Sequence, residues 1–345
     1  MNRITQSEVM SELPWFQRGS FPLYLAPMAG FTDVVFRELC KEQGADVMVT
    51  EFVMANKFLD ERSRDSAWET IDFSLEQRPM GVQIFGSDPV KMAQAGQLIA
   101  DRMQPDFIDI NFGCPAPKVV ENCAGSSLLK DLNLLEKVAR TVADGLRGIV
   151  PVTAKIRIGW DDESVVAREA CQRLESAGMA AIAIHGRTKM QGYRGNADWE
   201  VIEAAASAVS IPVVGNGAVE GIPLHQHLEG MITRGHVSGL MVGRAALGYP
   251  WIFREIKTYL ETGDILPPPS LEERWETMLR YSRKLMERPA NADRWNRLNW
   301  MRSRLKSFTK IIPGCRELRQ ELDQIITYEQ LVELSERHLQ AHQSE

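Results

Sequence analysis

Residues 107–115 read Phe-Ile-Asp-Ile-Asn-Phe-Gly-Cys-Pro, a short apolar run that passes directly into a polar turn containing glycine. Such a run is typical of a strand covered on both faces, as in a parallel sheet flanked by helices. Similar runs recur at 23–26, 46–50, 80–84, 152–156, 180–184, 212–214 and 238–242. Amphipathic stretches separate them. The sequence therefore predicts eight parallel strands alternating with helices, which favours a (β/α)8 (TIM) barrel over an open doubly wound sheet.

The strand pattern stops near residue 263. Gly263 and the prolines at 267–269 form a stiff break, and Ser270 with Glu273 is a capping box that opens a new helix. No comparable strand-like run follows. We therefore expect a small C-terminal helical domain after the barrel, and divide the chain into an N-terminal extension (1–20), a barrel domain (21–262) and a helical domain (270–345).

The composition is that of a globular protein, because 44% of residues are hydrophobic and 25% charged, which excludes a disordered chain. No apolar run approaches the ~18 residues that span a bilayer, and the first residues do not resemble a signal peptide. The five cysteines are scattered and form no CxxC pair, which argues against disulfides, iron–sulfur clusters and structural zinc. We expect a cytoplasmic protein with no metal site and no membrane association, and no obligate protein partner is evident.

Charge is unevenly distributed along the chain. Residues 280–319 contain twelve Lys or Arg against three acids, a net of +9, whereas the whole chain carries −6. The remainder therefore carries 28 basic and 43 acidic residues, a net of −15. A basic segment on an acidic body indicates a polyanionic partner for that segment. Three of its cations are spaced four residues apart and should form one helix stripe, namely Arg302, Lys306 and Lys310.

Polar and glycine residues follow several predicted strands, at the end where a barrel places its chemistry. Asn216-Gly217 and Gly243-Arg244 follow the last two strands, the usual place for a phosphate. Lys155 lies inside an apolar run, where a lysine needs a partner. It could stabilise negative charge on a bound cofactor or pair with Asp109 or Glu51, and His185 could equally be a core histidine.

These residues resemble the tRNA-dihydrouridine synthase family, nearest to its bacterial B-type branch. The resemblance is carried by motifs at 26–33 (APMAGFTD), 82–86 (VQIFG), 109–118 (DINFGCPAPK), 124–129 (AGSSLL), 155–160 (KIRIGW), 185–188 (HGRT), 216–217 (NG) and 243–244 (GR). They occur in the family's order over about residues 23–255. The family implies FMN as cofactor, NADPH or NADH as its reductant, and tRNA as substrate.

The resemblance also implies roles for individual residues. Cys114 matches the family's catalytic cysteine and Asn111 its uridine-contacting asparagine. The residues implied to bind FMN are Pro27, Met28, Ala29, Gln83, Lys155, His185, Asn216, Gly217, Ala218, Gly243 and Arg244. We expect Arg302, Lys306 and Lys310 to contact tRNA.

A thiol suits the implied reaction. Hydride addition at C6 of uracil leaves an enolate that needs a proton at C5, and a cysteine with its ordinary pKa of about 8.5 is mostly protonated at neutral pH. Three other functions stay open at this point. They are a flavin barrel acting on a small molecule, a non-catalytic tRNA-binding protein, and a Schiff-base aldolase that uses Lys155.

Overall fold

The computed structural model describes residues 13–17, 19–218, 224–288, 294–312 and 314–343. Most of the expected N-terminal extension therefore lies outside the described residues. Contacts divide the chain into two compact units. The first comprises residues 1–34 and 45–243, and the second residues 35–44 and 244–345. The sequence-based boundary at residue 262 groups the chain differently, because helix α11 (Ile252–Thr262) belongs by its contacts to the second unit.

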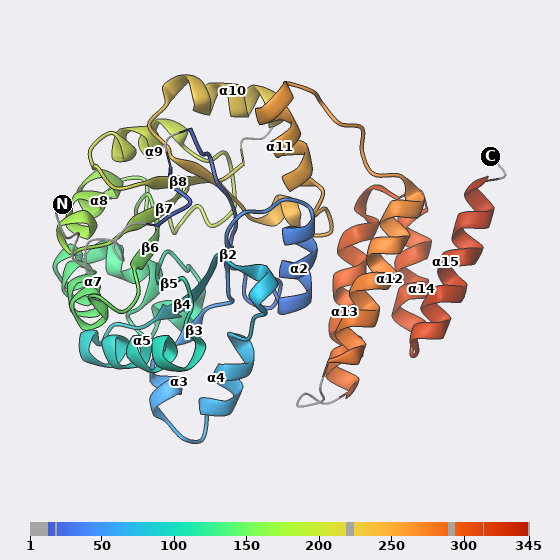
Figure 1. The fold of residues 1–345 in the computed structure, drawn as a ribbon, viewed down its shortest axis with the longest axis horizontal. Helices are drawn as coiled ribbons and strands as arrows, with labels where there is room; N and C mark the ends of the chain where they lie inside the picture. The colour runs from blue at the N-terminus through green and yellow to red at the C-terminus, as the bar shows by residue number, and fades with distance from the viewer. Residues whose placement is uncertain (1–12, 18, 219–223, 289–293, 313, 344–345) are drawn as a thin grey trace, which may run out of the picture. The chain divides into compact units, whose positions relative to one another are not determined.

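The first unit is built on a parallel barrel (Figure 1). Its strands pair in the order β1-β9-β8-β7-β6-β5-β4-β2, and a parallel bridge between Tyr24 and Val47 joins β1 to the segment before β2. The strands are β1 (Leu23–Leu25), β2 (Met48–Val49), β4 (Met80–Phe85), β5 (Phe107–Phe112), β6 (Val152–Arg157), β7 (Ala181–His185), β8 (Val213–Asn216) and β9 (Gly239–Val242). All eight expected strands are present, which confirms the barrel. The sequence did not predict a ninth, β3 (Val53–Met54), which pairs with the end of β4.

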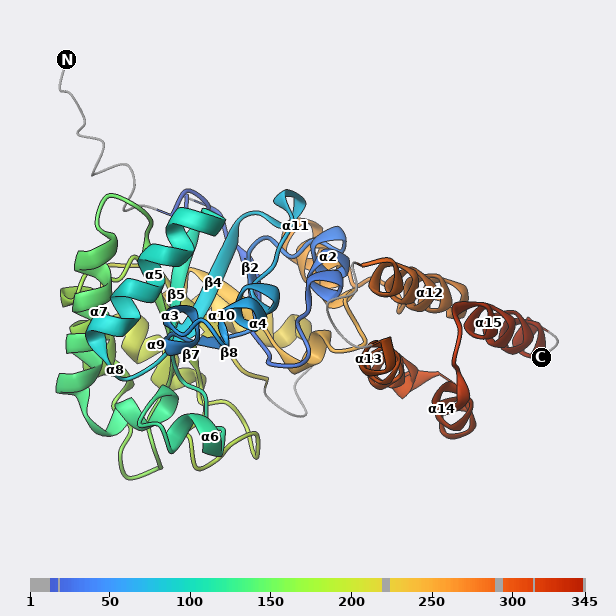
Figure 2. The same ribbon diagram turned by 90° about the horizontal axis from the view of Figure 1, so that it is seen from below.

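Helices surround this barrel, as Figures 1 and 2 show. Asp88 caps one of them, α5, by accepting hydrogen bonds from the amides of Val90 and Lys91. The described helices and 3-10 turns of this unit are α3 (Asn56–Leu59), α4 (Arg64–Thr70), η1 (Leu75–Gln77), α5 (Pro89–Met103), α6 (Pro117–Val120), η2 (Gly125–Lys130), α7 (Leu132–Leu146), α8 (Ala167–Ser176), α9 (Trp199–Ala206) and α10 (Leu224–Arg234). Among the described residues no helix combines the length and apolar character needed to cross a membrane.

Side chains alternate between the outside and the inside of the barrel along each strand. Outward residues pack under the helices, whereas the inner face is apolar only toward the amino-terminal strand ends. There Leu13, Trp15 and Phe16, which precede β1, pack against Tyr24 and Phe107. The Trp15 indole also donates a 2.6 Å hydrogen bond to the Tyr24 hydroxyl. The segment before β1 therefore fills this end of the barrel.

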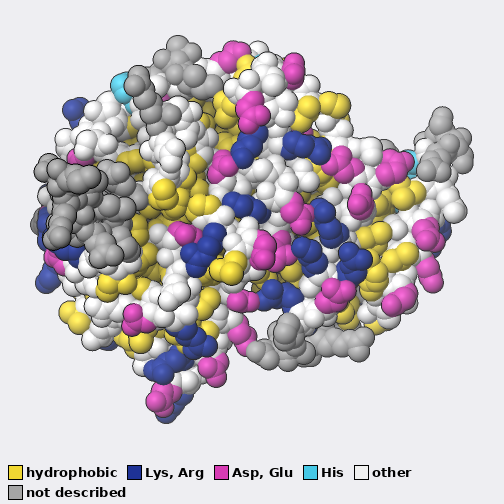
Figure 3. Space-filling view, viewed as in Figure 1, with side chains coloured by type: hydrophobic (Ala, Val, Ile, Leu, Met, Phe, Trp, Pro, Cys, Tyr) yellow, Lys and Arg dark blue, Asp and Glu magenta, His cyan; other side chains and the backbone are white. Residues whose placement is uncertain are grey.

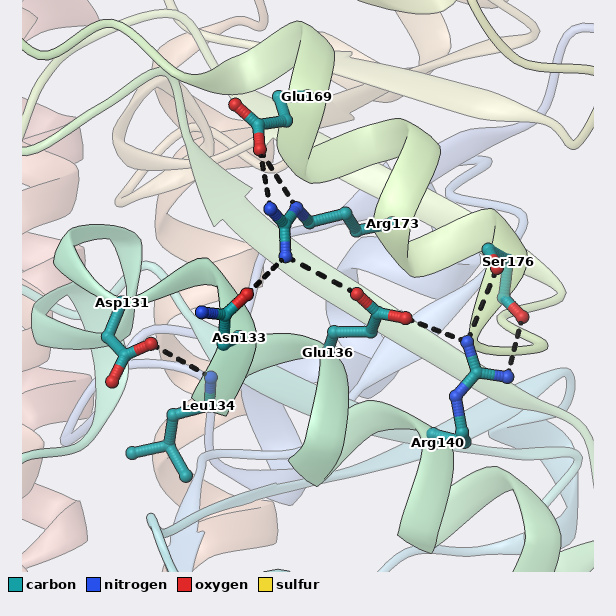
Figure 4. Close-up of polar contacts among 8 residues, drawn as sticks. All are labelled: Asp131, Asn133, Leu134, Glu136, Arg140, Glu169, Arg173 and Ser176. Carbon is teal, nitrogen blue, oxygen red and sulfur yellow. Dashed lines mark hydrogen bonds and ion pairs between the residues drawn. The ribbon is translucent and has the colours of Figure 1, made fainter.

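Helices α7 and α8 are joined by charged side chains (Figure 4). Arg173 binds Glu169 on its own helix at 2.8 Å and Glu136 on α7 at 3.4 Å. Glu136 also pairs with Arg140 at 2.8 Å, and Arg140 donates to the Ser176 carbonyl at 3.0 Å. The hydrogen bond from Arg140 lowers the pKa of Glu136, so the carboxylate stays ionised. These ion pairs join the two helices, but because they are partly exposed each adds only a little to the free energy of unfolding.

The second unit is helical where it is described. It comprises α2 (Val34–Glu42, from Val35 onward), η3 (Arg244–Ala246), α11, α12 (Leu271–Glu287), α13 (Arg294–Phe308), η4 (Thr309–Ile311), α14 (Cys315–Gln324) and α15 (Tyr328–Gln343). Figure 2 shows α12–α15 side by side. Their shared core includes Trp275, Met278, Leu305 and Leu322. The expected helix start is confirmed, because Ser270 Oγ accepts from the Glu273 amide at 3.2 Å, although the Glu273 carboxylate pairs with Arg254.

Candidate functional site

The loop that carries Cys114 is held by the side chain of Asn111, at the end of β5. Asn111 Oδ1 accepts hydrogen bonds from the backbone amides of Gly113 (3.1 Å) and Cys114 (2.8 Å). Its Nδ2 donates to Gln83 Oε1 at 2.8 Å. Both acceptor positions of the Asn111 oxygen are therefore used, and one N–H of Nδ2 is left for a further acceptor.

A buried carboxylate anchors this arrangement inside the barrel. Asp109 accepts from Gln83 Nε2 at 2.5 Å and from the Thr153 hydroxyl at 2.6 Å. Burial raises the pKa of Asp109, although both hydrogen bonds oppose the rise. Because Asp109 is the acceptor in both of these hydrogen bonds, it sets the direction of every amide that follows: Gln83 donates to Asp109, Asn111 donates to Gln83, and Asn111 accepts from the Cys114 loop.

Cys114 itself is partly exposed and has the character of a neutral thiol. Burial raises its pKa, and the opposing influences of the Ala116 amide and of Arg157 and Lys155 are smaller. Its backbone carbonyl accepts from both the amide (3.1 Å) and the hydroxyl (2.9 Å) of Ser126, which closes the loop. The thiol is thus held in place and protonated at neutral pH.

Lys155 extends from β6 toward β8, where its Nζ lies 3.3 Å from Asn216 Oδ1. No carboxylate of the described residues lies within ion-pair distance, so the pair with Asp109 or Glu51 is not formed. Burial, with a smaller contribution from Arg157, lowers the pKa of Lys155 to about 8. The side chain is therefore a cation at neutral pH that loses its proton in mildly alkaline solution.

Arg157 and Arg187 hold the loops of this site together. Both lie in the sequence motifs quoted above, but the sequence alone assigned them no role. Arg157 Nε donates to the Gly113 carbonyl at 3.0 Å, and its Nη1 donates to the carbonyls of Thr188 and Gly192 at 2.8 Å each. The β5 loop with Cys114 is thereby joined to the loop after β7. The signal in the sequence was an arginine two residues after Lys155 on the same strand, and therefore on the same inner face.

Arg187 plays the equivalent part for the next pair of loops. Its Nη2 donates to the carbonyls of Gly195 (2.6 Å) and Ala218 (3.1 Å), and its Nη1 lies 3.2 Å from His185 Nε2. His185 is buried at the end of β7, beside Arg187 and the ring of Tyr193. It therefore lies in the site and not in the apolar core.

Residues from three separate loops meet around Gly243. A Cβ at this position would lie 3.7 Å from Ala26 Cβ and 3.9 Å from both Met28 Sδ and Asn216 Nδ2. Asn216 is fixed by donating to the Met241 carbonyl at 2.7 Å. Gly243 therefore lies where the loops after β1, β8 and β9 meet, within van der Waals distance of a residue from each of them.

A second glycine is required for a different reason. Gly217 has φ 129°, and a Cβ there would lie 2.5 Å from Ala197 Cβ and 3.1 Å from His185 Cδ2. Its carbonyl accepts from the Trp199 indole at 3.0 Å. Only glycine allows the backbone at position 217 to pass this close to Ala197 and His185.

The other residues expected at the cofactor are placed as follows. Pro27 is buried, whereas Ala29 is exposed in the turn closed by Phe31 and Thr32, whose amides donate to the Met28 carbonyl. Ala218 is exposed, and the residues that follow it, 219–223, lie outside the described part of the chain. Arg244 begins η3 in the second unit, directly after Gly243. Gln83 is fully buried, so its contacts in this structure are with Asp109 and Asn111.

The three cations expected to contact tRNA lie in the second unit but do not form one continuous stripe. Helix α13 ends at Phe308, so Lys310 lies in the following 3-10 turn, where it is exposed. Arg302 donates to the Ile325 carbonyl at 2.8 Å and 2.5 Å, and Lys306 forms an ion pair with Asp323. Figure 3 shows basic and acidic side chains interspersed over the C-terminal helices on the face in view.

A family model described as dihydrouridine synthase matches residues 24–344 of this chain. The chain belongs to this family. It is 40% identical over 265 residues to tRNA-dihydrouridine synthase B of Shewanella oneidensis, which covers 77% of this chain and 80% of that protein. The protein of the same description from Pseudomonas aeruginosa is 39% identical over 303 residues, or 88% of each chain. Both relatives confirm the expected B-type branch of the dihydrouridine synthases.

Solved structures with little sequence similarity share the barrel. A complex of 2-naphthoyl-CoA reductase matches with a TM-score of 0.50 at 12% identity, over 68% of this chain and 49% of that chain. This likeness is one of fold alone.

Proposed function

We propose that this dihydrouridine synthase reduces uridines of tRNA to 5,6-dihydrouridine, with FMN as bound cofactor, NADPH or NADH as its reductant and Cys114 as proton donor. The observation that carries the proposal is the placement of Cys114, in the loop directly after β5, at the same barrel end as Lys155, which lies beside Asn111 on the neighbouring strand β6. When bound, FMN supplies the hydride for C6 of the uracil. A cytoplasmic location fits this activity.

The residues of the site fit FMN. Met28, Asn216 and Gly243 lie together where three loops meet, and the close turn at Gly217 suits a ribityl phosphate chain beside His185. Pro27, Ala29, Ala218 and Arg244 would complete the binding site, and Gln83 would act chiefly by supporting Asn111. Lys155 would place its positive charge by the electron-rich edge of the reduced ring system.

Cys114 completes the reaction by giving its proton to C5 of the uracil. Because burial raises the thiol pKa, the proton is present at neutral pH and the thiolate is not. Asn111 holds the thiol in position and would direct its remaining Nδ2 hydrogen to a uracil carbonyl. A Schiff-base aldolase that uses Lys155 would not need the thiol that Asn111 holds in place at Cys114.

The uridine must leave its stack to reach the barrel, at a cost of a few kcal/mol. Contacts to the RNA backbone have to offset this cost. The basic segment at 280–319, with exposed Arg283, Lys310 and Arg316, would supply part of them. Arg302 and Lys306 would have to exchange their present partners for phosphate to take part.

The titration of Lys155 gives a pH prediction. We expect kcat/KM for tRNA to fall as pH rises through about 8, because Lys155, whose pKa is lowered to about 8, then loses its positive charge. The raised pKa of Cys114 keeps the thiol protonated over this range, so the thiol does not cause the fall. In Lys155→Arg the falling limb should move to higher pH. A limb that superposes on that of the wild type would contradict the role of Lys155.

The function is tested by mapping dihydrouridine across tRNA from a strain that lacks this protein. We expect dihydrouridine to disappear from one or a few positions and to return when the wild-type chain is supplied. The purified protein should carry a flavin spectrum, and its reduced flavin should be reoxidised faster by tRNA than by free uridine. An unchanged dihydrouridine map would overturn the proposal, whereas equal reoxidation by both substrates would favour a small-molecule reductase.

A further inference from the structure

Two lysine ammonium groups share one indole ring at the carboxyl-terminal end of the barrel. Nζ of Lys189 lies 4.3 Å and Nζ of Lys130 lies 4.7 Å from the ring centroid of Trp160. At these distances the ring attracts a cation. Lys130 is exposed, and Trp160 and Lys189 are partly exposed. The ring therefore supports two positive charges that solvent can reach.

The three residues come from three consecutive loops of the proposed active site. Trp160 follows β6, Lys189 follows β7, and Lys130 ends η2 in the segment that follows β5 and Cys114. The Lys189 amide donates to the Gly159 carbonyl at 3.0 Å, and the Met190 amide donates to the Trp160 carbonyl at 2.9 Å. These two hydrogen bonds fix the Trp160 and Lys189 loops against each other. In Figure 2 the loops after β6 and β7 project with α6 from the lower end of the barrel.

Neither ammonium group is neutralised. Among the described residues no carboxylate lies within 4.0 Å of Nζ of Lys130 or Lys189, and the other polar contact of Lys189 is with Met190 Sδ at 3.6 Å. The adjacent Asp161 and Asp162 accept hydrogen bonds from neighbouring hydroxyl groups, at 2.6 Å and 3.4 Å. An ammonium group on a ring still has N–H donors to offer.

We propose that Lys130 and Lys189, supported by Trp160, bind phosphates of the RNA strand that presents its uridine to Cys114. This inference rests on the proposed function and adds a phosphate-binding site on the barrel itself. Outside the basic segment at 280–319 the chain carries a formal net charge of −15, which disfavours binding of a polyanion. The ammonium groups of Lys130 and Lys189, which have no carboxylate partner among the described residues, would attract RNA phosphates at the barrel entrance.

The site is tested by the salt dependence of tRNA binding to the FMN-loaded enzyme. We expect Lys130→Ala and Lys189→Ala each to lower the slope of log affinity against log salt by about 0.7–0.9, and the double variant to bind roughly 10-fold or more weakly at about 0.1 M salt. Lys137→Ala removes an exposed charge from α7, which is not part of these loops, and is the matched control. Trp160→Leu keeps both charges, so it should weaken binding with little change in slope.

Two readouts separate this proposal from the proposed function. FMN content and its reduction by NADPH without RNA should equal those of the wild type in all the variants, which shows that they are folded. Dihydrouridine formation by the wild type tests the function, whereas affinity and salt slope test the phosphate site. Lysine variants that match Lys137→Ala in both affinity and slope would overturn the site even if the wild type makes dihydrouridine.

Discussion

Replacing Cys114 by alanine is expected to lower turnover on tRNA by roughly 10²–10⁴-fold, the usual contribution of a positioned proton donor. Binding of FMN and its reduction by NADPH should be retained, because none of the residues around Gly243 depends on the thiol. The measurement is a single-turnover assay in which prereduced enzyme is mixed with tRNA and both flavin oxidation and dihydrouridine are followed.

The matched control is Cys123→Ala, which removes an exposed thiol nine residues further along the same loop. This variant should turn over like the wild type. The raised pKa also predicts that iodoacetamide modifies Cys123 before Cys114 at neutral pH, because the thiolate is the reactive form. If Cys114→Ala reduced tRNA at the wild-type rate, another group would have to supply the proton.

Asp109→Ala is expected to lower kcat by roughly 10- to 100-fold although Asp109 lies inside the barrel, because loss of about 1 Å in positioning has an effect of this size. Alanine removes both acceptor oxygens, so Gln83 Nε2 and the Thr153 hydroxyl lose their common partner. Thr153 can turn its hydroxyl, but Gln83 cannot reverse its amide without losing the hydrogen bond from Asn111. The defect therefore reaches the Cys114 loop.

The same substitution should cost about 1–3 kcal/mol of unfolding free energy, the cost of an unsatisfied buried polar group. Asp131→Ala is the control, since it removes a carboxylate that caps α7 through the Leu134 amide. It should lower stability by about 1 kcal/mol and leave kcat unchanged. Thr153→Val removes the other donor to Asp109 and leaves the hydrogen bond from Gln83 intact. It should therefore lower stability with little loss of kcat, and an equal loss of kcat in both buried variants would exclude the directional effect of Asp109.

Sequence reasoning located the strands because burial on both faces leaves a continuous apolar run, as at 152–156 and 180–184. It missed β3, whose two residues are too short for any periodicity. It also placed Cys114, Asn111 and Lys155 at one end of the barrel, since parallel strands end together. The cofactor residues followed from the family resemblance, and their contacts with FMN are still proposals.

The hydrogen-bond partners inside the barrel could not be predicted, because they depend on register between strands distant in sequence. The pairing of Gln83 with Asp109 and of Asn111 with Lys155 is such a case. Lys155 hydrogen-bonds to Asn216, 61 residues away, and not to Asp109 or Glu51, the acids of other predicted strands that were considered as its partners. The basic stripe was extended one turn too far because helix propensity alone does not mark the end of α13 at Phe308.

The aromatic residues that fill the amino-terminal end of the barrel have a kinetic consequence. With Trp15 and Phe16 packed over Phe107 and Tyr24, small molecules cannot pass through the barrel along its axis. In the proposed reaction, the nicotinamide donor and the uridine would then share one entrance and bind there in succession. Initial rates measured at several fixed NADPH concentrations should accordingly give the parallel double-reciprocal lines of a double-displacement enzyme.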